Sequence, residues 1–98
     1  MTLPLVFHPD VNDEVDDARR WYNRQRKGLG ADFVRALKDA LQQLSAMPLV
    51  NRVLSRNVRR ALLRRFPYGV YYRVYPDRVQ VIAVQHLHRD SGGWQSRA

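Results

Sequence analysis

Cysteine is absent from the chain, and no stretch approaches the length of a membrane-spanning helix. Without cysteine, neither a disulfide framework nor a thiolate metal site is available, so a disulfide-rich secreted class is excluded. A membrane span needs roughly 20 apolar residues, and residues 1–7 lack the basic flank and the apolar length of a signal peptide. We therefore expect a cytoplasmic protein with no membrane partner.

Lysine is scarce, and acidic residues are nearly missing from the second half. Residues 1–51 carry seven basic and seven acidic side chains, so this half is neutral. Residues 52–98 carry ten arginines against Asp77 and Asp90, which accounts for the whole net charge of +8. Such a local excess indicates an acidic partner. The arginines from 52 to 65 have no acid among them, which favours a patch for carboxylates or phosphates over a merely solvated face.

The chain does have enough apolar surface for one hydrophobic core. Of its 98 residues, 45% are hydrophobic and ten are aromatic, which excludes disorder caused by low hydrophobicity. A chain of this length has room for one domain only. We expect a single domain over residues 1–98.

Apolar residues recur at helical spacing in two stretches of the first half. The first predicts a helix over residues 10–25, with acids in its first turns and arginines near its end, as the helix dipole favours. The second predicts a helix that ends at Met47, before Pro48. Gly28 and Gly30 lie between them and are interpreted as positions for a positive φ and for close helix packing. The two helices should form an antiparallel hairpin.

Short apolar runs bounded by turn residues predict four strands. The first covers residues 3–7, and Pro4 places it at an edge or end position. The other three cover 58–66, 70–75 and 79–87 and form an antiparallel meander because the turns between them are short. The expected fold is therefore α+β: an N-terminal strand, an antiparallel helical hairpin and a three-stranded antiparallel meander, in the order β-α-α-β-β-β.

The alternation of side chains predicts how the meander packs. Along 70–75, the alternate side chains that begin with Val70 should meet the helices, and those that begin with Tyr71 should face away. The run 81–84 is apolar on both faces, which predicts an interior strand. Residues 91–94 are expected to form a loop.

Four short strings follow one another at a spacing that is specific in combination, although each string alone is weak evidence. They are Trp21-Tyr22 with Gly28-Leu29-Gly30 and Phe33, the pair Arg59-Arg60, the turn Arg65-Phe66-Pro67-Tyr68 with Tyr71-Tyr72, and His86 through Arg89-Asp90 to Trp94. In this order they resemble the RelE/ParE superfamily of type II toxin–antitoxin toxins, and most closely its ParE-like branch of plasmid stabilisation proteins. The resemblance covers nearly the whole chain. It implies a growth-inhibiting toxin that a cognate antitoxin neutralises.

The same strings also have plain structural interpretations. Trp21 and Tyr22 are more often core or groove aromatics than catalytic groups. His86 and His88 share one face of a strand, but with only Asp90 nearby a zinc site is not favoured. A hydrogen-bonded histidine is the simpler interpretation. We expect neither a metal nor a cofactor.

The resemblance implies two alternative mechanisms. ParE-like toxins bind and poison DNA gyrase and have no recognised active site, whereas RelE-like toxins cut messenger RNA on the ribosome. An RNase of this kind needs basic groups to stabilise a charged phosphate transition state and a group to transfer protons. The residues that could supply such a metal-independent set are Arg60, Arg64, Arg73, His86, His88 and Arg89.

Departures from the RelE pattern favour gyrase as the target. That pattern has alternate basic residues before the turn, another after the turn's aromatic, and a tyrosine near the C-terminus. Here Leu62 interrupts the alternation, Gly69 follows Tyr68, and no tyrosine comes after Tyr75. A third alternative is a nucleic-acid-binding module that stacks bases on Tyr71 and Tyr75, but lysine is scarce and no expected helix is basic.

Two sets of contact residues follow from the resemblance. The helical hairpin should bind the antitoxin in a toxin–antitoxin hetero-oligomer, because its aromatics can act as anchors, and the arginine-rich half should bind the target. For the antitoxin we expect Trp21, Tyr22, Leu29 and Phe33. For the target we expect Arg59, Arg60, Arg64, Arg65, Arg73, Arg89 and Trp94.

Overall fold

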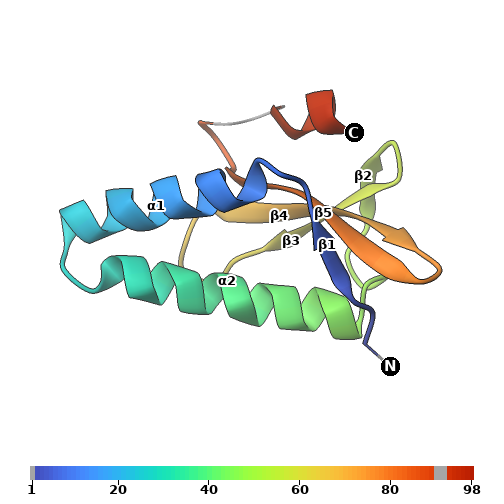
Figure 1. Ribbon diagram of the computed structural model, residues 1–98, viewed down its shortest axis with the longest axis horizontal. Helices are drawn as coiled ribbons and strands as arrows, with labels where there is room; N and C mark the ends of the chain where they lie inside the picture. Colours follow the sequence, from blue (N-terminus) through green and yellow to red (C-terminus); the bar gives the residue numbers. More distant parts are fainter. Residues whose placement is uncertain (1, 90–92) are drawn as a thin grey trace.

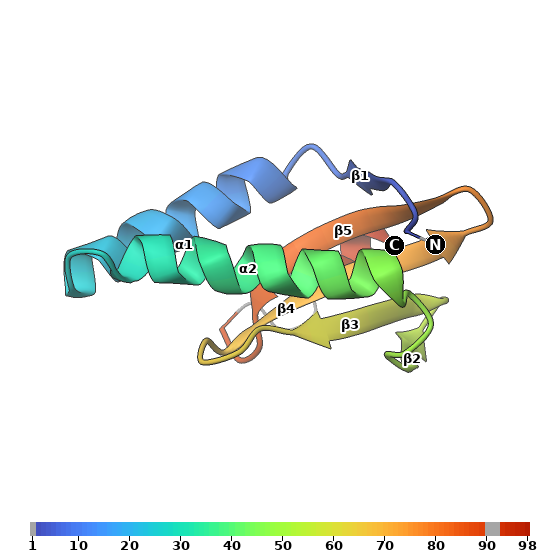
Figure 2. The same cartoon turned by 90° about the horizontal axis from the view of Figure 1, so that it is seen from below.

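The structure is a computed structural model that describes residues 2–89 and 93–98. A helical hairpin lies across one face of a twisted five-stranded sheet, and a short C-terminal turn packs on the opposite side (Figures 1 and 2). We call these two sides the helix face and the far face. No helix among the described residues is long and apolar enough to cross a membrane.

Two antiparallel helices form the hairpin, as the spacing of apolar residues predicts (Figure 1). Helix α1 covers Val11–Gln25 and α2 covers Leu29–Ala46. Each buries one stripe of side chains and leaves the rest in water, which is the reason for the 3.6-residue periodicity. The stripe of α1 consists of Val11, Ala18 and Tyr22, and that of α2 of Gly30, Phe33, Leu37, Ala40 and Leu44.

The two glycines between the helices have the roles that the sequence suggested. Gly28 has a φ of 89°, the left-handed region that side chains rarely adopt, and it lets the chain reverse. Gly30 sits where the helices touch, because a Cβ there would lie 2.5 Å from the carbonyl oxygen of Arg19. No larger residue fits at that contact.

The sheet has five strands in the order β1-β5-β4-β3-β2. Its members are β1 Leu5–Phe7, β2 Val53–Ser55, β3 Val58–Leu62, β4 Tyr68–Tyr75 and β5 Arg78–His86. The antiparallel meander of β3, β4 and β5 confirms the expected fold. The complete sheet is mixed, because β1 runs parallel to β5, and β1 lies at an edge as Pro4 suggested.

Several strand limits differ from those expected. Strand β3 ends at Leu62 rather than at residue 66, and Tyr68 and Gly69 belong to β4 rather than to a turn. The additional strand β2 joins β3 through Arg56 and Asn57, both at positive φ. Two-residue hairpins favour this conformation, but glycine is its usual sequence signal. In a turn of this type glycine is most common at the second residue, and Asn57 occupies that position here, so no glycine marks the hairpin in the sequence.

Packing confirms the expected faces of the meander. Val70, Tyr72 and the half-buried Val74 pack with the helices, while Tyr71 packs on the far face against Trp94. Strand β5 is interior, as residues 81–84 indicated. A bulge opposite Tyr71 and Tyr72 places both Ile82 and Ala83 on the far face.

The C-terminal segment is not the expected loop, as far as it is described. Gly93–Arg97 form a 3-10 turn, η1, while Ser91 and Gly92 lie outside the described residues. Trp94 in this turn is 6% exposed and stacks on Tyr71 with 5.1 Å between ring centroids. The turn therefore completes a small second core on the far face.

Candidate functional site

A cleft of about 580 Å³ opens beside β5, where the neighbouring strand β1 has already ended. Parallel pairing of β1 with β5 stops at Phe7 and Val81, whereas β5 continues to His86. Backbone groups of β5 beyond this point therefore need other partners. Helix α1 forms the opposite wall, and Arg89 and Arg97 also line the cleft. The lining residues are Glu14, Asp17, Ala18, Arg20, Trp21, Arg24, Tyr68, Val84, Gln85, Arg89 and Arg97.

Side chains take the place of the missing strand at the floor of this cleft. Glu14 accepts hydrogen bonds from the backbone N–H of Val84 at 3.1 Å and from Nε2 of Gln85 at 2.9 Å. Arg97 donates to Glu14 at 2.9 Å and to the carbonyl oxygen of Ile82 at 3.2 Å. The charge-assisted bond to Glu14 raises the pKa of Arg97 above its ordinary value, so this guanidinium stays charged. This network connects α1, β5 and η1.

One polar atom at the floor has no partner. Gln85 is 5% exposed, and its Oε1 accepts no hydrogen bond from any described residue. A buried acceptor without a donor costs about 1–3 kcal/mol. A hydrogen bond to Oε1 of Gln85 would remove this cost.

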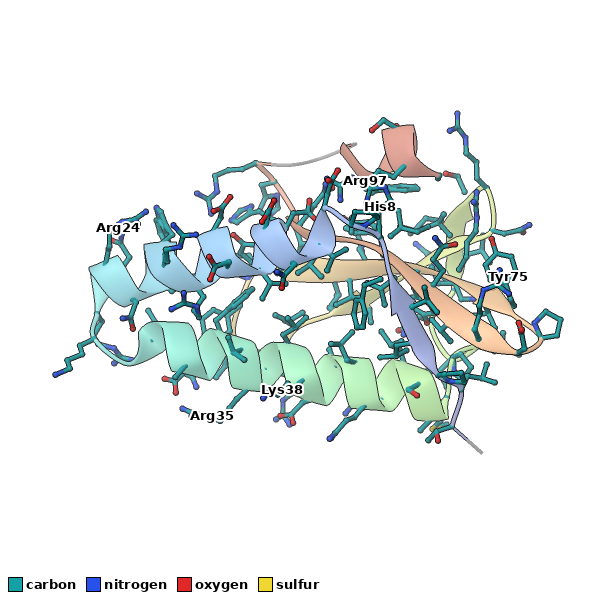
Figure 3. The ribbon with its side chains drawn as sticks, viewed as in Figure 1. His8, Arg24, Arg35, Lys38, Tyr75 and Arg97 are labelled. Atoms are coloured by element: carbon teal, nitrogen blue, oxygen red, sulfur yellow. The ribbon has the colours of Figure 1, made fainter. Side chains whose placement is uncertain are left out.

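The outer part of the cleft is cationic and aromatic. Arg20 is paired with Asp16, whose pKa is lowered by hydrogen bonds from Arg19 and Arg20. In contrast, Arg24 and Arg89 form no ion pair within the described residues. The guanidinium of Arg89 lies over the ring of Trp21, 5.1 Å from its centroid. Figure 3 shows Arg24 at the C-terminal end of α1 and Arg97 above the start of the same helix.

The four residues expected to bind an antitoxin divide between the surface and the core. Trp21 is 37% exposed and Leu29 is partly exposed. Phe33 is fully buried and Tyr22 nearly so, and the two rings stack 5.4 Å apart. Burial also raises the pKa of Tyr22. Of these four residues, Trp21 and Leu29 are the two whose side chains are accessible to a partner in this conformation.

Three of the seven residues expected at the target surface already make contacts within the fold. Arg59 donates to the carbonyl oxygens of Leu49 and Asn51. Arg73 donates to the carbonyl oxygens of Arg56 and Ala98. Trp94 is buried, so it cannot serve as a surface anchor while η1 is docked. In this conformation the ring packs on Tyr71, and a direct contact of Trp94 with the target stays a prediction that would require η1 to move.

The other expected target residues point in different directions. Arg60 lies along the far face, where a Cβ on Gly69 would approach its side chain to 2.9 Å. Gly69 thus leaves room for the side chain of Arg60. A lysine or arginine at position 69 would collide with it. Arg64 borders a groove beside α2, and Arg65 lies 4.0 Å from Asp32 and over the ring of Phe66.

The candidate RNase residues do not gather at one point. His86 and His88 have ring centroids 5.8 Å apart, and His86 contacts Tyr68, with which it is paired across β4 and β5. Arg73 is five residues from Tyr68 along β4, roughly 17 Å at the rise of a strand, and is bonded to backbone carbonyls. Arg60 is on the far face and Arg64 is beside α2.

Within residues 2–89 and 93–98, no group of three histidine, aspartate or glutamate side chains could hold a metal ion. Asp90 lies outside that range.

Sequence reasoning missed the cleft and its three floor residues, Glu14, Gln85 and Arg97. Glu14 is one of several acids at the start of α1, and nothing in the sequence distinguishes it from Asp13. Gln85 and Arg97 are separated from it by about seventy and eighty positions. Only the end of β1 and the docking of η1 bring the three together.

The family model described as the ParE toxin of the type II toxin–antitoxin system parDE matches residues 5–91. The chain belongs to the ParE toxin family. A comparison with curated proteins finds no match.

Two solved structures share the fold. A protein of the chromosomal ParDE system of P. aeruginosa aligns with a TM-score of 0.64 and 16% identity, over 87% of this chain and 96% of that one. A free mutant of the E. coli toxin RelE aligns with a TM-score of 0.70 and 20% identity, over 100% of this chain and 95% of that one. These two structures share the expected α+β fold, and the family match identifies the chain as a ParE-family toxin of the type II toxin–antitoxin class.

Proposed function

We propose that this ParE-family toxin acts in the cytoplasm by binding DNA gyrase and is neutralised by a cognate antitoxin. The observation that carries this proposal is the dispersal of the candidate catalytic residues. Arg73 lies in the second half of β4 and is bonded to backbone carbonyls, whereas His86 of β5 is paired with Tyr68 at the start of β4, and Arg64 lies beside α2. In-line RNA cleavage needs its basic groups and its proton donor around one phosphate.

A binding mode of action requires no such convergence. Among the expected target residues, Arg60 and Arg64 form no hydrogen bond or ion pair within the described residues, so their guanidinium groups can bind carboxylates of a protein target. The helix face contributes Trp21 and Leu29 as contacts for the antitoxin. A ring such as Trp21, half exposed at the edge of a cleft, supplies large contact area at low entropic cost.

Induction of the chain alone in a bacterium tests the proposal. DNA-damage signalling should rise before any loss of messenger RNA, and co-expression of the cognate antitoxin should restore growth. A matched strain that carries Arg60→Gln and Arg64→Gln should show weaker signalling at equal protein level. Codon-dependent cleavage of messenger RNA that precedes the damage response would overturn gyrase as the target and favour the ribosome instead.

A further inference from the structure

We infer that the cleft beside β5 is a binding site for an extended segment of the antitoxin that carries a carboxylate between Arg24 and Arg89. This inference rests on the proposed partnership with an antitoxin and specifies where and how the partner binds. Three features of the cleft support it: a strand edge that no neighbouring strand covers, two arginines that form no ion pair with any described residue, and an exposed tryptophan.

The strand edge favours a peptide. Beyond the end of β1, the N–H of Val84 and the carbonyl of Ile82 are bound only by the side chains of Glu14 and Arg97. A peptide laid along this edge can offer backbone donors and acceptors of its own, as in strand addition. It also brings N–H donors, and Oε1 of Gln85 needs one. That oxygen is buried, so the amide must turn toward the cleft to receive the bond.

The two arginines of the cleft favour a ligand that carries a carboxylate. Arg24 and Arg89 line the cleft without a carboxylate partner in the described residues, and Arg89 is already fixed over Trp21. A guanidinium held against an aromatic ring binds a carboxylate with little further loss of freedom. Glu14 and Asp17 line the other part of the cleft. A continuous polyanion such as RNA would be repelled by these two carboxylates, whereas a peptide with a single acid avoids that penalty.

Trp21 gives the segment an apolar anchor. Its ring is 37% exposed and packs edge-on against the buried Tyr22, which holds it in place. An apolar side chain next to the antitoxin's acid would cover the ring and remove water from the arginine pair. Desolvation strengthens such a pair.

The test measures the affinity of the purified toxin for its cognate antitoxin, with toxin variants at the cleft and away from it. Arg24→Gln and Arg89→Gln should each weaken binding by about tenfold, since each removes a charge-assisted contact. Arg78→Gln is the control, because Arg78 begins β5 at the end opposite His86, forms an ion pair only with the exposed Asp77 among the described residues and does not line the cleft. Its affinity should stay at the wild-type value. Urea unfolding of all three variants shows whether each remains folded, and Arg89→Lys should recover part of the loss.

The second half of the experiment uses variants of the antitoxin. Each acid in the antitoxin's toxin-binding region is changed to its amide, and one such change should weaken binding to wild-type toxin but not to Arg89→Gln, as expected for a direct pair. Wild-type affinity in both folded arginine variants would overturn the cleft as the site while leaving the antitoxin partnership intact. If wild-type toxin and antitoxin form no complex, both the proposed antitoxin partnership and the proposed cleft site are wrong. Displacement of the antitoxin by a short single-stranded RNA that depends on Arg24 and Arg89 would assign the cleft to phosphates and contradict the inference.

Discussion

Among the described residues, sixteen hydrophobic side chains are buried in one cluster on the helix face of the sheet, whereas the hydrophobic cluster of the far face buries five. The helix face contains four mutually packed rings, Tyr22, Phe33, Phe66 and Tyr68. The far face depends on Trp94 and on arginines that bind backbone carbonyls of the terminal turn. Burial of apolar area stabilises in proportion to its extent, so the helix face should determine whether the chain folds. The far face should determine only whether its C-terminal turn is docked.

The largest effect is expected at the centre of the helix face. Phe33 is fully buried among three other rings. Phe33→Ala should lower the free energy of unfolding by about 3–5 kcal/mol, the usual result of removing a buried ring. Urea unfolding measures it, with Leu49→Ala as the control, because Leu49 is 65% exposed. A loss below about 1 kcal/mol would mean that the ring cluster does not support the fold.

A smaller effect is expected at the corresponding residue of the far face. Trp94→Ala should lower the free energy of unfolding by about 2 kcal/mol, less than a central ring, because a terminal turn can detach while the rest of the domain persists. Hydrogen exchange should become faster around Tyr71 and Ile82, which Trp94 covers, and remain slow in α2. Faster exchange throughout the chain would show that the two faces unfold as one unit.

The next effect concerns the network that links the two faces. Arg97→Gln removes the bond to Glu14, and both side chains are less than one fifth exposed. We expect a loss of about 1–2 kcal/mol, since Glu14 keeps its bonds from Val84 and Gln85. Arg78→Gln is the matched control, because its pair with Asp77 is exposed and such pairs contribute little. Equal losses in the two variants would argue against a special role for Arg97.

The smallest effect distinguishes two tyrosines of the helix face. The hydroxyl of Tyr72 donates to the carbonyl oxygen of Pro48 at 2.8 Å and accepts a bond from Asn51. Tyr72→Phe should cost about 1 kcal/mol at neutral pH. Tyr22→Phe should cost less, because no hydrogen bond of the Tyr22 hydroxyl is seen among the described residues.

The same two phenols should also make stability fall in alkali. Burial raises the pKa of both above the ordinary value of 10. Their contribution to stability is therefore complete below pH 10, and it is lost as the pH rises above 10, where the unfolded chain ionises first. The double variant with Phe at both positions should show a shallower decline above pH 10 than the wild type. An identical decline would place its cause elsewhere.

The sequence predicted the helix face well, because apolar residues recur at the helical or strand period wherever one face of an element is buried. The spacing of Phe33 and Leu37 marked α2, and alternation along β4 assigned Val70 and Tyr72 to the helices. Strand β2 was missed because it is three residues long and its turn, Arg56-Asn57, lacks glycine. The packing of Trp94 on Tyr71 could not be predicted, because a single aromatic in a glycine-rich tail gives no signal of the ring on which it stacks.

The candidate site was less predictable than the fold. Family resemblance pointed to Trp21 and to Arg89, and both line the cleft. It could not reveal Glu14 or Arg97, whose significance comes from where β1 ends and where η1 docks. Nor could it show that Arg73 is bonded to backbone carbonyls several residues along β4 from the Tyr68–His86 pair. Long-range packing, which the sequence of one chain does not encode locally, decides these positions.

The central claim, that this toxin acts by binding gyrase, is tested most directly with purified components. DNA supercoiling by gyrase is measured in the presence of wild-type toxin and of folded His86→Ala, and ribosome-bound messenger RNA is assayed with the same two proteins. The account predicts inhibited supercoiling by both proteins and intact messenger. Uninhibited supercoiling, together with codon-dependent messenger cleavage that falls by about a hundredfold or more in His86→Ala, the usual loss on removal of a general acid or base, would contradict it.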